Sequence, residues 1–201
     1  MSQSIVSSEA KLIQRCRQGD KEALGQVFRQ HAAALEGLLR RVVGPHGDVD
    51  DLLQLTFVAA IRAFPKFRGE ASLRTWLSRI AVYTARDHLR QADRRRRVDV
   101  GAADGGLERA GGLTGASLDQ QVARRRQLQR VYAHLQHIDA KKRTAFVLHV
   151  FDGRPIEEVA ELTGASITAT KSRIFWTRKQ LLARVRRDPS LRELWEGGGL
   201  T

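Results

Sequence analysis

Four basic side chains lie close together in the C-terminal part of the chain, where residues 156–182 read IEEVAELTGASITATKSRIFWTRKQLL. They are Lys171, Arg173, Arg178 and Lys179. Ammonium and guanidinium groups neutralise phosphates, and an arginine can also read the edge of a base. These residue types predict recognition of a polyanion, without the making or breaking of bonds.

Two short helices joined by a tight turn must position these cations. Gly164 can adopt the positive φ that ends a helix sharply, and Ser166 is a suitable N-cap for the next helix. Apolar periodicity predicts the inward-facing positions of the two helices: Ile156, Val159 and Ala160, then Thr170, Ile174, Thr177 and Leu181. This pattern is typical of a helix-turn-helix, whose second helix enters the major groove. An ordinary helical hairpin with solvated Lys and Arg remains the alternative.

The composition extends the polyanion prediction to the whole chain. The 201 residues are 42% hydrophobic and carry a formal net charge of +13, with a sequence pI near 11.0. Basic residues exceed acidic ones in residues 1–98 and again in residues 119–201, whereas the intervening segment has a slight acidic excess. Two basic blocks predict two modules that face nucleic acid. A basic membrane-surface protein would need a strong apolar face opposite its charges, and none is evident.

Cysteine and histidine usage excludes several other classes. Cys16 is the single cysteine, so no disulfide framework is possible, and its apolar neighbours predict a buried thiol. The six histidines show no metal-ligand spacing, so neither a metal nor a cofactor is expected. No secretory signal and no long apolar stretch is present. We therefore expect a cytoplasmic protein that is not inserted into a membrane.

Helical periodicity and chain breakers predict an all-α protein of two small helical domains. Residues 9–98 form the first domain, with helices expected at 9–18, from the N-cap Asp20 to about 43, at 48–64 and at 72–90. The inward stripe of the third helix is predicted to be Leu53, Phe57, Ile61 and Phe64. Residues 99–118 are rich in glycine and predict a flexible linker. Residues 119–186 form the helix-turn-helix domain, and 187–201 a tail.

Two segments resemble the extracytoplasmic-function (ECF, group IV) sigma factors of the sigma-70 family, which give bacterial RNA polymerase its promoter specificity. Residues 48–97, DVDDLLQLTFVAAIRAFPKFRGEASLRTWLSRIAVYTARDHLRQADRRRR, look like the region 2 domain of the family. Residues 135–181, LQHIDAKKRTAFVLHVFDGRPIEEVAELTGASITATKSRIFWTRKQL, look like its region 4 domain. Both motifs, in this order and with a short linker, make the resemblance specific.

The resemblance implies a sigma factor that binds core RNA polymerase, recognises promoter DNA and promotes its melting for transcription initiation. The acidic helix start would bind the polymerase through Asp48, Asp50, Asp51 and Gln54, although these carboxylates also suit a helix dipole. The promoter −10 element and the melted single strand would contact Phe67, Arg68, Glu70, Ser72, Arg74, Arg79, Arg86 and Arg90. The −35 element would contact Ser166, Thr168, Lys171, Ser172, Arg173 and Arg178. Trp76 is expected in the core. An anti-sigma factor is a further expected partner.

The chain departs from the family pattern at four positions. Leu55 stands where an acidic residue is usual, and Tyr83 occupies the position of an Asn linked to −10 reading. Ala169 lacks a frequent Thr hydroxyl, and Trp176 replaces a common Arg. These departures predict an unusual promoter sequence.

Two other functions are less consistent with the sequence. A stand-alone helix-turn-helix transcriptional regulator would need no acidic clamp helix followed by an arginine-rich helix. A nucleic-acid enzyme needs clustered carboxylates or a His/Cys metal set. The acidic cluster at residues 48–51 lies at a helix start without histidine, so the sequence does not predict an enzyme.

Overall fold

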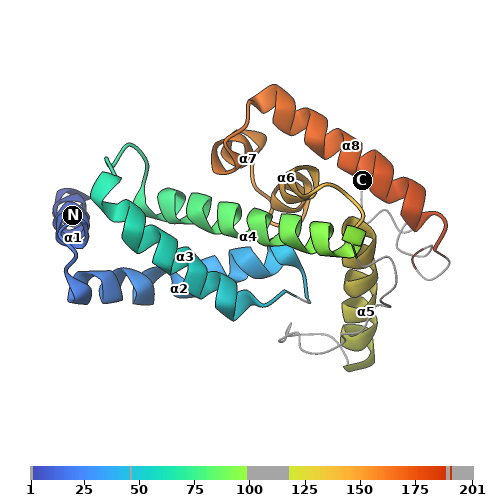
Figure 1. The fold of residues 1–201 in the computed structure, drawn as a ribbon, viewed down its shortest axis with the longest axis horizontal. Coiled ribbons are helices and arrows are strands. Elements are labelled where there is room, and N and C mark those ends of the chain that lie inside the picture. Colours follow the sequence, from blue (N-terminus) through green and yellow to red (C-terminus); the bar gives the residue numbers. More distant parts are fainter. Residues whose placement is uncertain (1, 46, 99–117, 189–190, 192–201) are drawn as a thin grey trace.

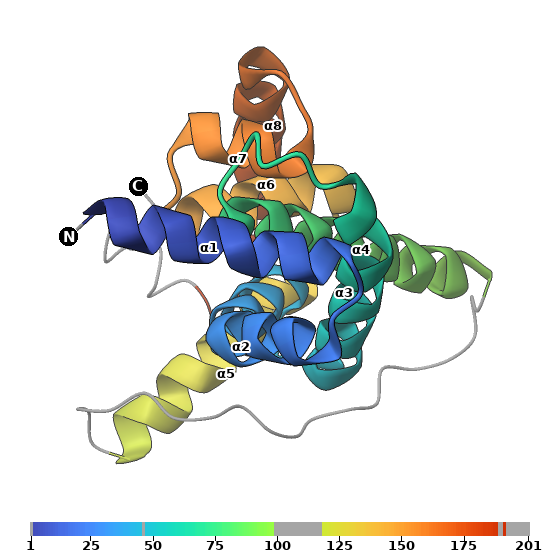
Figure 2. The same cartoon turned by 90° about the vertical axis from the view of Figure 1, so that its left-hand side faces the viewer.

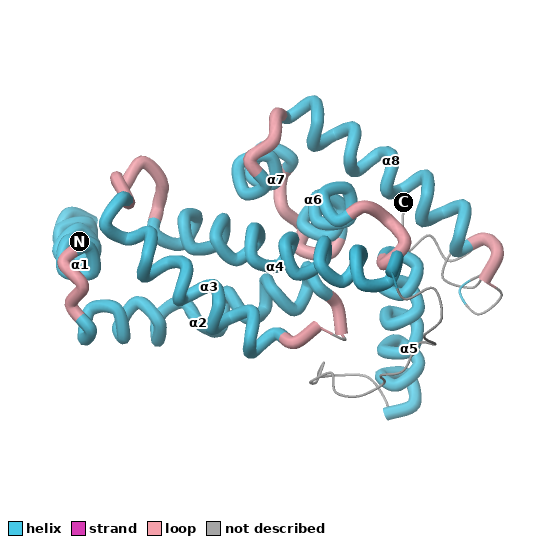
Figure 3. The backbone as a smooth tube through the Cα atoms, in the orientation of Figure 1, coloured by secondary structure: helices cyan, strands magenta, loops and turns pink. Residues whose placement is uncertain are grey.

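The computed structural model describes residues 2–45, 47–98, 118–188 and 191, and within these ranges the regular structure is entirely helical. Figure 1 shows the arrangement of the helices, and Figure 3 separates helices from loops. In chain order they are α1 (Ser2–Arg17), α2 (Lys21–Val43), α3 (Val49–Ala63), the short 3₁₀ helix η1 (Phe64–Lys66), α4 (Leu73–Val98), α5 (Leu118–Leu135), α6 (Ala140–Val150), α7 (Ile156–Thr163) and α8 (Ile167–Val185). The predicted all-α class is confirmed. The predicted linker, apart from Leu118, and the end of the predicted tail lie outside the described residues.

In the N-terminal half, α1 to α4, the helices α2 and α3 begin at side-chain caps. The Asp20 carboxylate accepts hydrogen bonds from the amides of Glu22 and Ala23 at 2.9 and 3.1 Å, as predicted for an N-cap. Asp48 caps α3 in the same way through the Asp51 amide. Leucine, valine and phenylalanine side chains of α2, α3 and α4 form the core of this half. Cys16 is buried in it, which confirms the expected structural thiol.

Three predictions about this half need correction. The helix expected to end near residue 90 continues to Val98, so the arginine run from Arg94 onward is part of α4. Ile61, predicted to face inward, is 48% exposed, because α3 buries Leu52, Thr56 and Ala60 instead. Phe28, an apolar position of the predicted second helix, is likewise exposed and leans on Phe57, with ring centroids 4.4 Å apart. Phe57 and Phe64 of the predicted stripe are buried as expected, so the helical period was right and only part of the predicted inward face is exposed.

The C-terminal half, α5 to α8, contains the predicted helix-turn-helix. Gly164 ends α7 with φ 61°, and the Ser166 hydroxyl accepts a hydrogen bond from the Ala169 amide at 3.2 Å. Thr170, Ile174, Thr177 and Leu181 are buried, as the periodicity predicted. Leu191, within the predicted tail, is also buried.

Helix α4 is the shared element of the two halves. It packs against α2 and α3 on one side and against α6 and α7 on the other. Figures 1 and 2 show α6, α7 and α8 lying over the side of α4 that α2 and α3 leave free. The two halves therefore contact each other directly, and this contact involves several of the predicted site residues.

Candidate nucleic-acid and protein interfaces

Helix α8 carries its cations outside its buried stripe, toward its outward surface. Thr168, Lys171, Ser172 and Arg178 are exposed, and Ser166 caps the helix start. Arg173 is half-buried. Because successive residues turn by about 100°, Lys171 and Arg173 lie on opposite flanks of the outward surface. The predicted −35 residues are thus brought together on one helix, on two flanks of it.

Two exposed aromatic side chains occupy the middle of the same surface, and of these the sequence pointed only to Trp176. Phe175 is 60% exposed and Trp176 is 44% exposed, with their ring centroids 5.5 Å apart in an edge-to-face arrangement. The Lys179 ammonium lies 5.2 Å from the Trp176 ring centroid, within cation–π range. The signal that would have identified Phe175 is its position one turn from Ser172 and Lys179, away from the buried stripe. We call Thr168, Lys171, Ser172, Phe175, Trp176 and Lys179 the α8 face.

Two of the predicted DNA-binding arginines of α4 form hydrogen bonds within the protein. Arg79 donates through Nε to the carbonyl of Glu161 at 3.0 Å, and Arg86 donates through Nη1 to the carbonyl of Thr163 at 3.4 Å. Both acceptors belong to the last turn of α7, where carbonyls lack helical partners and the helix dipole is negative. The Arg86 guanidinium also lies over the Tyr83 ring, 4.4 Å from its centroid. Arg74 and Arg90, on the same helix, are exposed.

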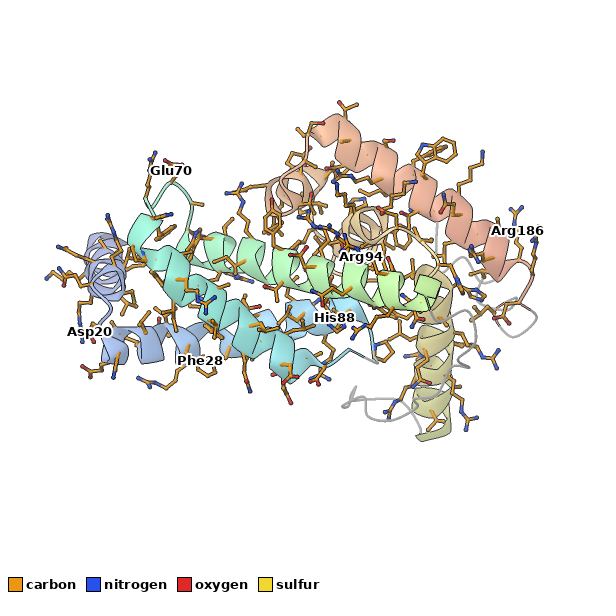
Figure 4. All side chains as sticks on the ribbon, in the orientation of Figure 1. Asp20, Phe28, Glu70, His88, Arg94 and Arg186 are labelled. Atoms are coloured by element: carbon orange, nitrogen blue, oxygen red, sulfur yellow. The ribbon has the colours of Figure 1, made fainter. Side chains whose placement is uncertain are left out.

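The loop at residues 65–72 borders a small hollow of about 300 Å³ beside Trp76 and Arg79. The Arg68 and Glu70 side chains are almost fully exposed and form a loose ion pair at 3.9 Å. Figure 4 shows Glu70 projecting from the tip of this loop. Ser72 caps the start of α4, because its hydroxyl accepts a hydrogen bond from the Thr75 amide at 3.1 Å.

Phe67, predicted to offer a free aromatic face in this loop, is only 5% exposed. Its ring packs against Trp76 at 4.6 Å and Phe64 at 6.4 Å between centroids. Trp76 is partly buried against the core, which confirms its expected structural role. In this conformation Arg68 and Glu70 at the rim of the hollow are exposed to solvent, whereas the Phe67 ring supports the loop.

Helix α3 exposes a surface that is acidic at its start and apolar along its length. Asp48, Asp50, Asp51 and Gln54 are exposed, and within the described chain Asp50 and Asp51 enter no ion pair. Leu55 at 56%, Val58 and Ile61 follow on the exposed side of the helix. We call Asp50, Asp51, Gln54, Leu55, Val58 and Ile61 the α3 face. An apolar centre with charges at its edge is the usual composition of a protein–protein interface.

Within the described residues, no group of three or more His, Cys, Asp or Glu side chains could hold a metal ion. In the same ranges, no helix is both long enough and apolar enough to cross a membrane.

The fold and these faces define an all-helical DNA-binding protein in two parts, and comparison with known proteins identifies its family. Residues 27–95 match the family model for Sigma-70 region 2, and residues 128–181 match that for Sigma-70 region 4. The ECF RNA polymerase sigma-E factor of Salmonella typhimurium is 32% identical over 173 residues, which span 85% of this chain and 90% of the relative. The RNA polymerase sigma factor CnrH of Cupriavidus metallidurans is 38% identical over 168 residues, spanning 82% and 87%. The chain belongs to the ECF group of the sigma-70 family.

Solved structures agree with this assignment. CnrH in complex with the cytosolic domain of CnrY superposes with a TM-score of 0.58 at 29% identity, covering 90% of this chain and 99% of that one. The sigma factor RpoE of Bartonella quintana, solved with the anti-sigma factor NepR, shares the fold with a TM-score of 0.57 at 23% identity, covering 82% and 97%. The region 2 match contains the α3 face and most of α4, and the region 4 match contains α6, α7 and most of α8.

Proposed function

We propose that this protein binds core RNA polymerase, directs it to specific promoters and promotes melting of the DNA for transcription initiation. The observation that carries the proposal is that one chain of the ECF group combines the α3 face with two separate cationic helices, α4 and α8. An acidic and apolar surface suits a protein partner, whereas cationic helices suit DNA. A stand-alone regulator needs only the second of these features. The protein itself supplies specificity and carries out no reaction.

The roles of the individual residues follow from their environments. The α3 face binds the polymerase, with Asp50 and Asp51 at its charged end and Leu55 at its apolar centre. Arg68, Glu70 and Ser72 at the hollow, with the arginines of α4, contact the −10 element and the melted strand. The α8 face, with Arg173 on its flank, enters the major groove at the −35 element. Because core polymerase works in the bacterial cytoplasm, we expect this protein to be cytoplasmic.

We extend the proposal to an anti-sigma factor. The relative CnrH has been solved with the cytosolic domain of CnrY. The two halves of this chain lie against each other, so a partner that bridges them would keep both DNA-facing helices away from a promoter.

The test of the proposed function is transcription reconstituted with purified core polymerase. The wild-type protein should direct specific initiation only together with core enzyme, and it should not shift promoter duplex by itself. Replacing Asp50 and Asp51 with Ala should weaken binding to core enzyme by about 2–5 kcal/mol, the usual cost of truncating buried charge-assisted contacts. Titration of labelled protein with core polymerase measures this affinity.

The control removes the same charge from another helix. Glu157 and Glu161 are exposed carboxylates of α7. Their replacement with Ala should leave core binding within twofold of the wild type. Equal affinities for the wild type and the Asp50/Asp51 variant would remove the α3 face from the polymerase interface.

A further inference from the structure

The two halves hold each other by capping each other's helices. Arg79 and Arg86 from the N-terminal half donate to the last carbonyls of α7, as described above. In the opposite direction, Tyr132 of α5 donates its hydroxyl to the Arg41 carbonyl at 2.5 Å, and Arg143 of α6 donates to the Val43 carbonyl at 2.8 Å. Both of these acceptors lie at the C-terminus of α2. Hydroxyl and guanidinium donors therefore satisfy two helix ends that would otherwise face solvent.

The glycine at each of these helix ends is approached by a tyrosine of the other half. Gly44 ends α2 with φ 88°, and a Cβ there would overlap the ring of Tyr132. Gly164 ends α7 with φ 61°, and a Cβ there would overlap the hydroxyl of Tyr83. The other positive-φ glycines of the described chain, Gly19, Gly69 and Gly153, have nothing within 4 Å of such a Cβ. Among these glycines, only the two at the contact between the halves, Gly44 and Gly164, leave no room for a side chain.

The interior of this contact is polar and closely fitted. Arg143 is 2% exposed, and burial lowers its pKa to about 10, so it remains charged at neutral pH. Burial also raises the pKa of Tyr132 to about 12, which keeps its hydroxyl a donor. Arg41 forms an ion pair with Asp152, whose side chain is almost fully buried. A buried cation held on backbone carbonyls loses these partners when the halves separate.

We propose that the protein closes on itself without any partner, and that this closure withholds Arg79 and Arg86 from DNA. The inference rests on the proposed DNA-binding role of α4. Each guanidinium is anchored on the end of α7 through one of its N–H groups, and α7 itself lies against this side of α4, so a nucleic-acid backbone cannot approach the two side chains from that side. Nucleic acid and the C-terminal half therefore compete for the same surface of α4.

The test measures the separation of the halves in the free, full-length protein. Fluorescent labels on cysteines introduced at the exposed positions Gln30 of α2 and Gln180 of α8, with Cys16→Ala, report closure by energy transfer. Gly44→Ala should lower the transfer, because its methyl group displaces the Tyr132 ring. Gly19→Ala is the matched control, since it places the same methyl group at a positive φ in open space.

A second readout is the binding of fluorescein-labelled oligo(dT) to the free protein. Gly44→Ala keeps every arginine of α4, so it should bind the oligonucleotide more tightly than wild type. If the closed form outnumbers the open one by about ten to one, the gain is about tenfold, because apparent affinity scales with the competent fraction. Gly19→Ala should bind like the wild type.

A pair of arginine variants keeps the test decisive if Gly44→Ala loses its helical circular dichroism. Arg79→Gln with Arg86→Gln should lower energy transfer, whereas Arg74→Gln with Arg90→Gln removes the same charge from α4 and should leave transfer unchanged. Equal transfer in all variants would overturn the closure. Failure of the proposed function itself would appear separately, as no promoter-specific transcription with core polymerase by the wild-type protein.

Discussion

Helices α4 and α8 carry the two sets of predicted DNA-binding cations, but the environments of these cations differ. The cations of the α8 face lie in solvent, around two exposed aromatic rings. Two arginines of α4 are already engaged by the end of α7, which precedes α8 in the same helix-turn-helix. The motif that would bind one promoter element therefore covers the residues that would bind the other.

Of the two surfaces, only that of α4 must lose contacts within the protein before it can bind DNA. A cation near a helix C-terminus is stabilised by about 0.3–1 kcal/mol, whereas a phosphate offers it a full negative charge. The α4 contacts with α7 are thus of the strength that a nucleic acid can replace. No comparable displacement is required before the α8 face can enter a groove.

The largest effect that separates the two helices is expected on α8. Arg173→Ala should cost about 1–3 kcal/mol in promoter binding by the holoenzyme and relax the preference at one upstream position. Lys171→Ala, on the opposite flank, should weaken binding to all promoters alike if that side chain contacts only phosphate. Transcription of a promoter library, randomised in the upstream element, measures both. Arg184→Ala, an exposed arginine in the last turn of α8, is the control. An unchanged upstream preference with Arg173→Ala would exclude Arg173 from base reading.

A smaller effect is expected at Trp176, where the aromatic pair replaces a charge. Trp176→Arg should add about one phosphate contact, so the slope of log affinity against log salt should steepen by about 1. The added charge would also lie near the Lys179 ammonium, which limits the gain at low salt. Holoenzyme binding to one promoter across a salt series gives the slope. A slope equal to that of the wild type would mean that position 176 does not approach the backbone.

The sequence predicted the local structure of the helix-turn-helix well, whereas it placed the end of α4 eight residues too early. Ser166, Gly164 and the stripe from Thr170 to Leu181 behave as their types and spacing indicated, because caps, glycine φ preference and helical period act over a few residues. Arg79 and Arg86 were recognised as cations of a DNA-facing helix by resemblance. Their partners, the carbonyls of Glu161 and Thr163, lie more than seventy residues away.

Helical periodicity could not predict the contacts between the two halves. The helical pattern around Tyr132 and Arg143 predicts that each lies on a helix. It does not predict that their hydrogen-bond partners are carbonyls at the end of α2. Ile61 was predicted to be buried for a related reason. Two sides of α3 carry apolar residues, and only packing against α2 and α4 decides which side is buried. Tyr83 departs from the family pattern, and in the structure its hydroxyl lies beside Gly164 at the end of α7.

The smallest effect is expected at Gly164, where substitution tests the single contact between the end of α7 and Tyr83 of α4. Gly164→Ala and Gly153→Ala both place a side chain at positive φ, which costs about 1–2 kcal/mol of unfolding free energy for an L-residue. Only at Gly164 does the new methyl group meet the Tyr83 hydroxyl, and because Tyr83 is 41% exposed its side chain can turn away. We therefore expect an extra cost of only about 0.5 kcal/mol, removed by Tyr83→Asn in a double-mutant cycle. Urea denaturation of the four proteins of this cycle, alongside Gly153→Ala with and without Tyr83→Asn, gives the coupling. A coupling at Gly153 as large as that at Gly164 would assign the effect to backbone strain, and the Tyr83 contact would then have no part in holding α7 against α4.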